Sequence, residues 1–175
     1  FDINFSAGSI TANDFVSLWL DNGATSGDHT GVPNMGLKAN QGAPSNTADY
    51  FVRTTGTGGN FDVPPPNATL GQSVSLFAHL WKTAPGGSYN RFALWVDGDL
   101  SDLPALLATT PNATATGNSG VSTISNFGFR GATLGSGDVI EISNLVIRNS
   151  PVPEPASAAL VLLALGGLAA SRRRG

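Results

Sequence analysis

The sequence predicts an all-β fold, a jelly-roll β-sandwich over residues 1–149, followed by a short C-terminal transmembrane helix. Three observations predict it. Short runs that alternate apolar and polar residues recur along residues 1–149, as half-buried strands do. Connectors rich in Gly, Asn, Pro and Thr separate these runs, and no stretch before residue 156 keeps a helical period with caps. At residue 150 a proline-rich segment leads abruptly into an uncharged apolar run.

Eight runs have the length and alternation expected of strands. In chain order they span residues 1–6, 14–21, 34–38, 49–53, 74–82, 90–97, 123–130 and 138–148. Residues 54–60 and 109–120 are typical connectors, and residues 103–108 are expected to form at most one or two helical turns. Many short strands joined by glycine-rich turns favour a sandwich or a jelly roll.

The clearest unit is a hairpin made by residues 74–82 and 90–97. Apolar residues occupy both faces of its strands, which indicates central strands. We place one set in the core between two sheets: Leu76, Leu80, Phe92, Leu94 and Val96. The opposite face carries Phe77, His79, Trp81 and Trp95, and we expect it to be either covered by loops or open, with His79 packed within its strand.

Composition and charge exclude several classes of protein. Charged residues make up only 12% of the 175 residues, compared with about a quarter in most globular proteins. The net charge is −3, which argues against nucleic-acid binding, where a basic surface is expected. Cysteine is absent, so no disulfide framework and no thiolate metal site can form.

The first residues already alternate as a strand would, and no charged segment followed by an apolar one precedes them. We therefore expect the chain to be a fragment whose upstream part, with an export signal and one or more N-terminal strands, is missing. A mature N-terminus and a cropped chain are the alternatives.

The C-terminal segment has the features of a membrane anchor. Residues 156–170 carry no charge, and their large apolar residues are Leu160, Val161, Leu162, Leu163, Leu165 and Leu168. Fifteen helical residues span about 22 Å, somewhat less than a bilayer core of about 30 Å. Arg172, Arg173 and Arg174 follow, and the positive-inside rule keeps them cytoplasmic and residues 1–150 outside. The alternative is a buried C-terminal helix of a soluble domain.

Residues 150–175 also resemble a known signal. Val152, Pro153, Glu154 and Pro155, then the apolar helix, then the three arginines resemble the PEP-CTERM sorting signal of Gram-negative bacteria. The resemblance implies export through the inner membrane and transient retention there by the helix. It further implies processing near the Pro-Glu-Pro motif by a membrane protease of the exosortase type, in bacteria that make exopolysaccharide or biofilm.

The body resembles a second family. Residues 74–81, 91–97 and 138–147 follow the pattern of the concanavalin A-like lectin and glucanase jelly roll, as found in laminin-G-like domains. The resemblance implies a glycan-binding module, in which Trp81 and Trp95 would stack on sugar rings. The alternative is that both tryptophans are core residues, which is the commoner role of aromatic residues in strands.

Catalysis is not expected. Retaining glycosidases need two carboxylates about 5 Å apart. Residues 1–149 contain one glutamate, Glu141, and the three-residue spacing from Asp138 points the two side chains to opposite faces of a regular strand. A degenerate glycoside hydrolase remains the alternative.

The segment after the hairpin is a candidate calcium loop. Asp97, Asp99 and Asp102 supply oxygen ligands, which Ca²⁺ prefers. An ordinary Asp-Gly turn is the alternative; otherwise no cofactor is expected. The sequence as a whole predicts an exported, non-enzymatic module of the cell surface or extracellular matrix. Its predicted partners are an exosortase-type protease, the inner membrane and, if it is lectin-like, a polysaccharide.

Overall fold

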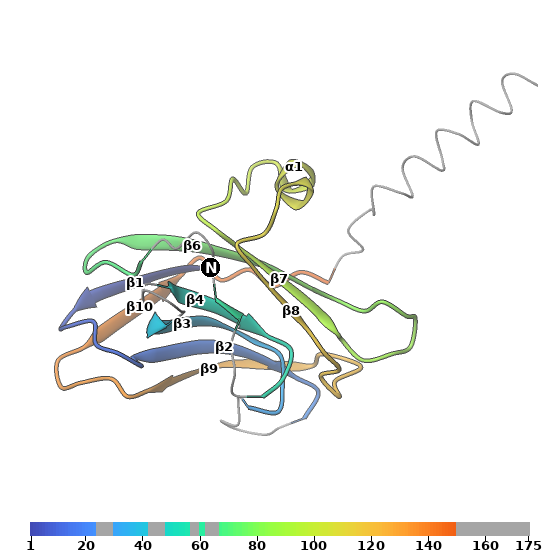
Figure 1. Cartoon of the computed structure of the whole chain (residues 1–175), viewed down its shortest axis with the longest axis horizontal. Coiled ribbons are helices and arrows are strands. Elements are labelled where there is room, and N and C mark those ends of the chain that lie inside the picture. Colours follow the sequence, from blue (N-terminus) through green and yellow to red (C-terminus); the bar gives the residue numbers. More distant parts are fainter. Residues whose placement is uncertain (24–29, 42–47, 57–59, 62–66, 150–175) are drawn as a thin grey trace, which may run out of the picture. The chain divides into compact units, whose positions relative to one another are not determined.

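The computed structural model describes residues 1–23, 30–41, 48–56, 60–61 and 67–149, and within them it is an all-β sandwich of two antiparallel sheets (Figure 1). Residues Phe1–Leu145 form one compact unit. Its strands are β1 Asp2–Ala7, β2 Phe15–Asp21, β3 Asn34–Gln41, β4 Ala48–Arg53, β5 Asn60–Phe61, β6 Ser73–Trp81, β7 Arg91–Val96, β8 Ala113–Thr116, β9 Asn126–Ala132 and β10 Val139–Ser143. The all-β prediction is confirmed, whereas the jelly-roll connectivity stays a prediction.

Each sheet has five strands. The first has the order β10-β1-β6-β7-β8 and the second the order β5-β4-β3-β2-β9. After β1 the chain leaves the first sheet and forms β2 to β5 of the second. It returns to the first sheet for β6 to β8, and then contributes β9 to the second sheet and β10 to the first. Strands distant in sequence therefore lie side by side: Asp2 pairs with Ser143, and Phe15 pairs with Ala132.

The main core fills the space between the sheets. Because side chains alternate along a strand, every second residue faces inward. The first sheet contributes Ile3, Val74, Leu76, Phe92 and Leu94, and the second contributes Val16, Leu18, Leu37, Tyr50 and Val52. Leu76, Phe92 and Leu94 are buried as predicted, whereas Leu80 and Val96 are only partly buried and pack against the edge of this core.

Two strands were not predicted from the sequence. Strand β8 lies within the expected connector 109–120 and consists of alternating Ala and Thr, which gives a weak apolar signal. It forms because Ala113 and Ala115 reach the core while its backbone pairs with β7. The short strand β5 overlaps the expected connector 54–60 and pairs with β4.

The predicted final strand is also longer than the observed one. Strand β10 ends at Ser143, and the next residue, Asn144, has a φ of 52°, which interrupts an extended strand. The Asn144 side chain donates a hydrogen bond to Asp2, so the end of β10 is tied to the start of β1.

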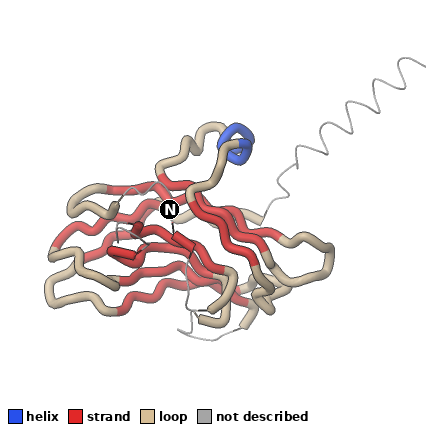
Figure 2. The backbone as a smooth tube through the Cα atoms, viewed as in Figure 1, coloured by secondary structure: helices blue, strands red, loops and turns tan. Residues whose placement is uncertain are grey.

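A single helix among the described residues, α1 Leu103–Ala108, lies against the outer face of the first sheet (Figures 1 and 2). It confirms the expectation of one or two helical turns at residues 103–108. Leu106 is its buried residue and packs with Ala93 and Trp95 of β7 in a second, smaller core. The sequence predicted that the outer face of the hairpin is either open or covered by loops. In the structure a helix covers part of this face.

The predicted apolar helix 156–170 lies outside the described residues. The described part of the chain contains no helical segment that could span a bilayer.

Truncating the main core is expected to be costly. Leu94 is 0% exposed, so Leu94→Ala should lower the free energy of unfolding by about 2–5 kcal/mol, because it removes buried methyl groups and leaves a cavity. Urea denaturation of the full chain measures this change. Leu100→Ala is the control, since Leu100 is 46% exposed and should change stability little. Equal losses for the two variants would contradict the assignment of the core.

Candidate functional site

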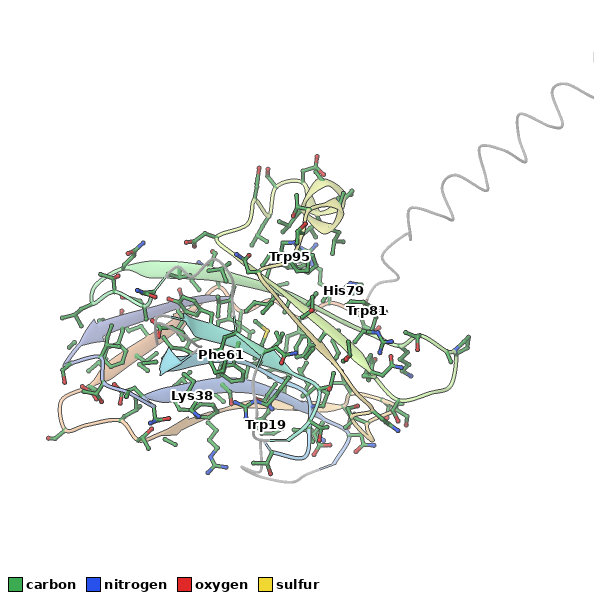
Figure 3. The ribbon with its side chains drawn as sticks, in the orientation of Figure 1. Trp19, Lys38, Phe61, His79, Trp81 and Trp95 are labelled. Atoms are coloured by element: carbon green, nitrogen blue, oxygen red, sulfur yellow. The ribbon has the colours of Figure 1, made fainter. Side chains whose placement is uncertain are left out.

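The outer face of β6 and β7 carries the aromatic residues that the sequence singled out for glycan stacking. The register places Phe77 opposite Trp95, His79 opposite Ala93 and Trp81 opposite Arg91. The tryptophans Trp81 and Trp95 therefore lie on one face of the hairpin, as the alternation predicts, although not on the same row. Figure 3 shows both, with His79, on this sheet.

Trp95 anchors helix α1. Its side chain is 5% exposed and lies against Leu106, and the ring of Phe77 packs beside it with centroids 5.5 Å apart. Its indole nitrogen donates a hydrogen bond of 3.1 Å to the Thr109 hydroxyl, which follows the helix directly. These contacts hold the Trp95 ring between the sheet and the helix, away from the open surface.

Trp81 is the more accessible of the two. It is half-buried and stacks against His79, with ring centroids 4.8 Å apart and an interplanar angle of 19°. Arg91 of β7 pairs with Trp81 across the hairpin. The next strand, β8, adds the exposed residues Thr114 and Thr116. This part of the face is a half-open platform of one indole and one imidazole ring.

The three aspartates proposed for calcium each accept a hydrogen bond from a backbone N–H group. Asp97 accepts from Ser75 at 2.9 Å, Asp99 from Ser101 at 2.9 Å and Asp102 from Ala105 at 3.0 Å. The Ser101 side chain and backbone lower the pKa of Asp99 below its usual value. Asp102 is the N-cap of α1. Within the described ranges no three acidic or histidine side chains come together as metal ligands, and calcium binding stays a prediction.

The acidic pair considered for catalysis is also part of the local hydrogen bonding. Glu141 is exposed on β10 and accepts a long hydrogen bond of 3.4 Å from Asn4. Asp138 accepts backbone hydrogen bonds from Ser9 and Gly135 at the preceding turn.

Sequence reasoning missed an array of basic and aromatic residues on the outer side of the second sheet, where Ser17, Asn34 and Phe51 are fully buried. Its central row crosses all five strands, and consists of Arg130, Ser17, Gly36, Phe51 and Phe61. The row on one side of it holds Gly128, Trp19, Asn34 and Arg53, and the row on the other side begins with Ala132, Phe15 and Lys38. We call this array the basic–aromatic face.

Two glycines of this face, Gly36 and Gly128, allow close contacts that a side chain would block. A Cβ on Gly128 would overlap the Trp19 ring, so that ring occupies the space beside Gly128 where a side chain would stand. A Cβ on Gly36 would overlap the carbonyl oxygen of Val16 on the neighbouring strand. Both glycines are therefore required by close contacts rather than by turns.

Arg53 is a buried cation of the basic–aromatic face: it is 3% exposed, and the Phe15 and Phe51 side chains beside it are buried as well. Its guanidinium lies 4.3 Å from the centroid of the Phe51 ring and 5.8 Å from that of Phe15, which is a cation–π arrangement. Burial lowers the pKa of Arg53 to about 10, so the group stays positively charged at neutral pH. It also donates a hydrogen bond to the Gly56 carbonyl at 3.3 Å.

Comparisons with known proteins identify the C-terminal segment. A family model described as the PEP-CTERM protein-sorting motif matches residues 151–174. Neither the curated proteins nor the solved structures contain a significant match to the chain. The matched segment includes Val152, Pro153, Glu154 and Pro155, the apolar run and the three arginines. The protein therefore carries a sorting signal for export, with membrane anchoring before processing by an exosortase-type protease.

The role of Asp102 as a helix cap can be tested against its proposed role as a calcium ligand. Asp102→Ala should lower the free energy of unfolding by about 1 kcal/mol, because the first turn of α1 loses its cap. We expect the same loss in CaCl₂ and in EGTA, measured by urea denaturation. A loss seen only in CaCl₂ would contradict a pure capping role and favour calcium binding.

Proposed function

We propose that the protein is a non-enzymatic module of the cell surface or extracellular matrix, which is released from its membrane anchor by processing at the Pro-Glu-Pro region. The observation that carries the proposal is the sorting motif at residues 151–174, which follows a β-sandwich directly in the sequence. In this proposal the tail determines delivery, and the sandwich is the part that remains outside the cell after processing.

The distribution of polar groups supports a non-enzymatic sandwich. Glu141, its one glutamate, is exposed and bonded to Asn4, and Asp138 is occupied by two backbone N–H groups. Neither carboxylate is buried, whereas the general acid of a glycosidase typically lies in an apolar pocket. These features favour a binding or structural role over glycoside hydrolysis.

The mature C-terminus tests the sorting proposal. In a host with an exosortase system, mass spectrometry of cell envelope and medium should find a chain that lacks residues 160–174, because the anchor is removed after recognition of the motif. Replacing Pro153, Glu154 and Pro155 with Ala, Gln and Ala should leave the tail attached and the chain in the envelope.

The matched control replaces three exposed residues outside the helices and strands instead, Pro85, Thr110 and Ser136, with alanine, and should be processed as the native chain is. An intact Arg172–Arg174 end on native chains in the cytoplasm would contradict the proposal.

A glycan-binding role for the hairpin face is the second candidate. The specific observation in its favour is the half-exposed stack of Trp81 on His79, because a flat aromatic ring can pack against the apolar face of a sugar. In this reading Trp95 supports the face from beneath α1 and does not itself contact the sugar.

A glycan array of the full chain in detergent tests this candidate. Trp81→Ala should abolish binding to the glycans that the native chain retains, since the platform is lost, while the thermal midpoint shows whether the variant is folded. Parallel arrays with CaCl₂ and with EGTA separate a calcium-assisted lectin from a calcium-independent one. Unchanged binding by a folded Trp81→Ala variant would exclude this face.

A further inference from the structure

We propose that the edge of the sandwich formed by β9 and β10, Asn126–Ala132 and Val139–Ser143, is an interface whose partner is a second copy of this chain. In the symmetric dimer, β9 of each copy pairs with β10 of the other, so both sheets continue from one molecule into the next. We call this surface the β9–β10 edge. The inference goes beyond the proposed function, because it concerns how the sandwich assembles and not how it is delivered.

The first observation is that one side of the sandwich is closed and the other is not. On the closed side, β8 of the first sheet lies against β4 and β5 of the second, and the Asn60 side chain donates a hydrogen bond to the Thr114 carbonyl. On the other side, β9 and β10 are the outermost strands of their sheets, and no comparable set of contacts joins them. No described strand pairs with the far edge of either one.

The second observation is that core-facing side chains of β9 are exposed. Phe127 lies opposite Leu20, and Phe129 lies opposite Leu18. Both leucines belong to the main core, and residues directly opposite each other point to the same face of a sheet. Yet Phe127 is 53% exposed and Phe129 is 39% exposed, although the Phe1 ring packs edge-on against Phe129 with centroids 5.7 Å apart.

The core-facing side chains of β10 are also incompletely covered. Ile140 lies opposite Phe5 and Ile142 lies opposite Ile3. Phe5 and Ile3 are buried, whereas both isoleucines of β10 are only partly buried. A single molecule therefore leaves apolar surface exposed along the β9–β10 edge, and such surface next to polar residues typically marks an interaction site.

The third observation is that the backbone of β10 is oriented to bond a further strand. The N–H and C=O groups of alternate residues point to opposite neighbours. Phe1 exchanges two backbone hydrogen bonds with Leu76 of β6, so the odd-numbered residues of β1 point to β6 and the even-numbered ones to β10. These pair with the odd-numbered residues of β10, which leaves the groups of Ile140 and Ile142 directed to the free edge.

The same argument applies to β9. The Leu20 N–H group donates to the Pro33 carbonyl on the β3 side, so the odd-numbered residues of β2 point to β9. They pair with the even-numbered residues of β9, and the groups of Phe127 and Phe129 are directed to the free edge. At both edges, therefore, the residues that offer backbone hydrogen bonds are those whose apolar side chains face the core.

The two edges together select a second copy as the partner. A turn at residues 133–138 reverses the chain between β9 and β10, so the two strands run in opposite directions (Figure 1). A two-fold axis that lies between the sheets and runs along the strands brings β9 of each copy beside β10 of the other in antiparallel orientation. A single extended peptide would complete only one sheet, and a bilayer would leave the backbone groups of both edges without partners.

Charge favours the pairing of β9 with β10 over the pairing of each strand with its own copy. Arg130 of β9 and Glu141 of β10 both alternate with core-facing residues and lie on the outer sides of their sheets. Pairing each strand with itself brings like charges together, which destabilises a sheet. Pairing β9 with β10 places Arg130 opposite Glu141, and in that register Phe129 lies opposite Ile142.

Sedimentation velocity of the full chain in detergent micelles tests the inference, and we expect a dimer that dissociates on dilution. Arg130→Glu and Glu141→Arg each create like charges at both contacts of the dimer. Each variant alone should therefore dimerise about tenfold more weakly. An equal mixture of the two variants should dimerise as the native chain does, because every contact then joins opposite charges. Asp99→Arg is the matched control: it makes the same charge change as Glu141→Arg at an exposed residue outside the strands, and should leave dimerisation unchanged.

Disulfide cross-linking is a second measurement, which covers the case that Arg130→Glu fails to fold. The chain has no cysteine, so a disulfide can form only between introduced residues. In the register given above Ala132 lies opposite Val139 of the other copy, within the distance that a disulfide spans. A mixture of Ala132→Cys and Val139→Cys chains should form a disulfide-linked dimer on oxidation, whereas a mixture of Val139→Cys and Leu100→Cys chains should not.

Each outcome bears on the inference, and thermal unfolding shows which variants are folded. A chain that stays monomeric would overturn it; flotation with lipid vesicles would then show whether the edge binds a bilayer instead. A dimer that the two folded charge variants leave intact, or that mixing does not restore, would also overturn it, since the association would then come from another part of the chain. The assay does not involve processing of the tail, so it can succeed or fail independently of the sorting experiment.

Discussion

The apolar layer between the two sheets is the constraint on which the other features depend. Each sheet alone would expose a broad apolar surface, and only their apposition buries residues such as Ile3, Leu37, Tyr50 and Leu94. Once this layer is in place, the residues between the inward positions must face outward. The two outer faces are therefore determined together with the core, one with its helix and one with its basic and aromatic residues.

Local alternation predicted much of this arrangement. It placed Leu76, Phe92 and Leu94 in the core and Phe77 and Trp95 on the opposite face, because a strand leaves little freedom in side-chain direction. It could not predict β8, whose Ala and Thr residues carry almost no apolar signal and which is ordered by pairing with β7. The end of β10 was also missed: Asn144 has a positive φ there, and it donates a hydrogen bond to Asp2, far away in sequence, which no local pattern reveals.

The basic–aromatic face could not be predicted for a related reason. Ser17, Gly36, Phe51, Phe61 and Arg130 form one row only because β9 pairs with β2 and β5 pairs with β4. Apart from Phe51 and Phe61, no two of these residues lie near each other in the sequence. The sorting tail is the opposite case. Its motif, apolar run and arginines are contiguous, so the linear sequence carries the whole signal, and the family match covers the same residues.

The pairing of β1 with β10 has a consequence for the time at which the protein can fold. Strands from the beginning of the chain, β1 and β2, each have one of their two partners, β10 and β9, near the end of the sandwich. Contacts between such distant segments form slowly and cannot form before the later segment is present. A chain that crosses a membrane starting at its N-terminus would therefore hold two unfinished sheets until β10 emerges. The sorting segment follows β10 closely in the sequence, so a newly exported molecule would complete its fold while still tethered to the membrane.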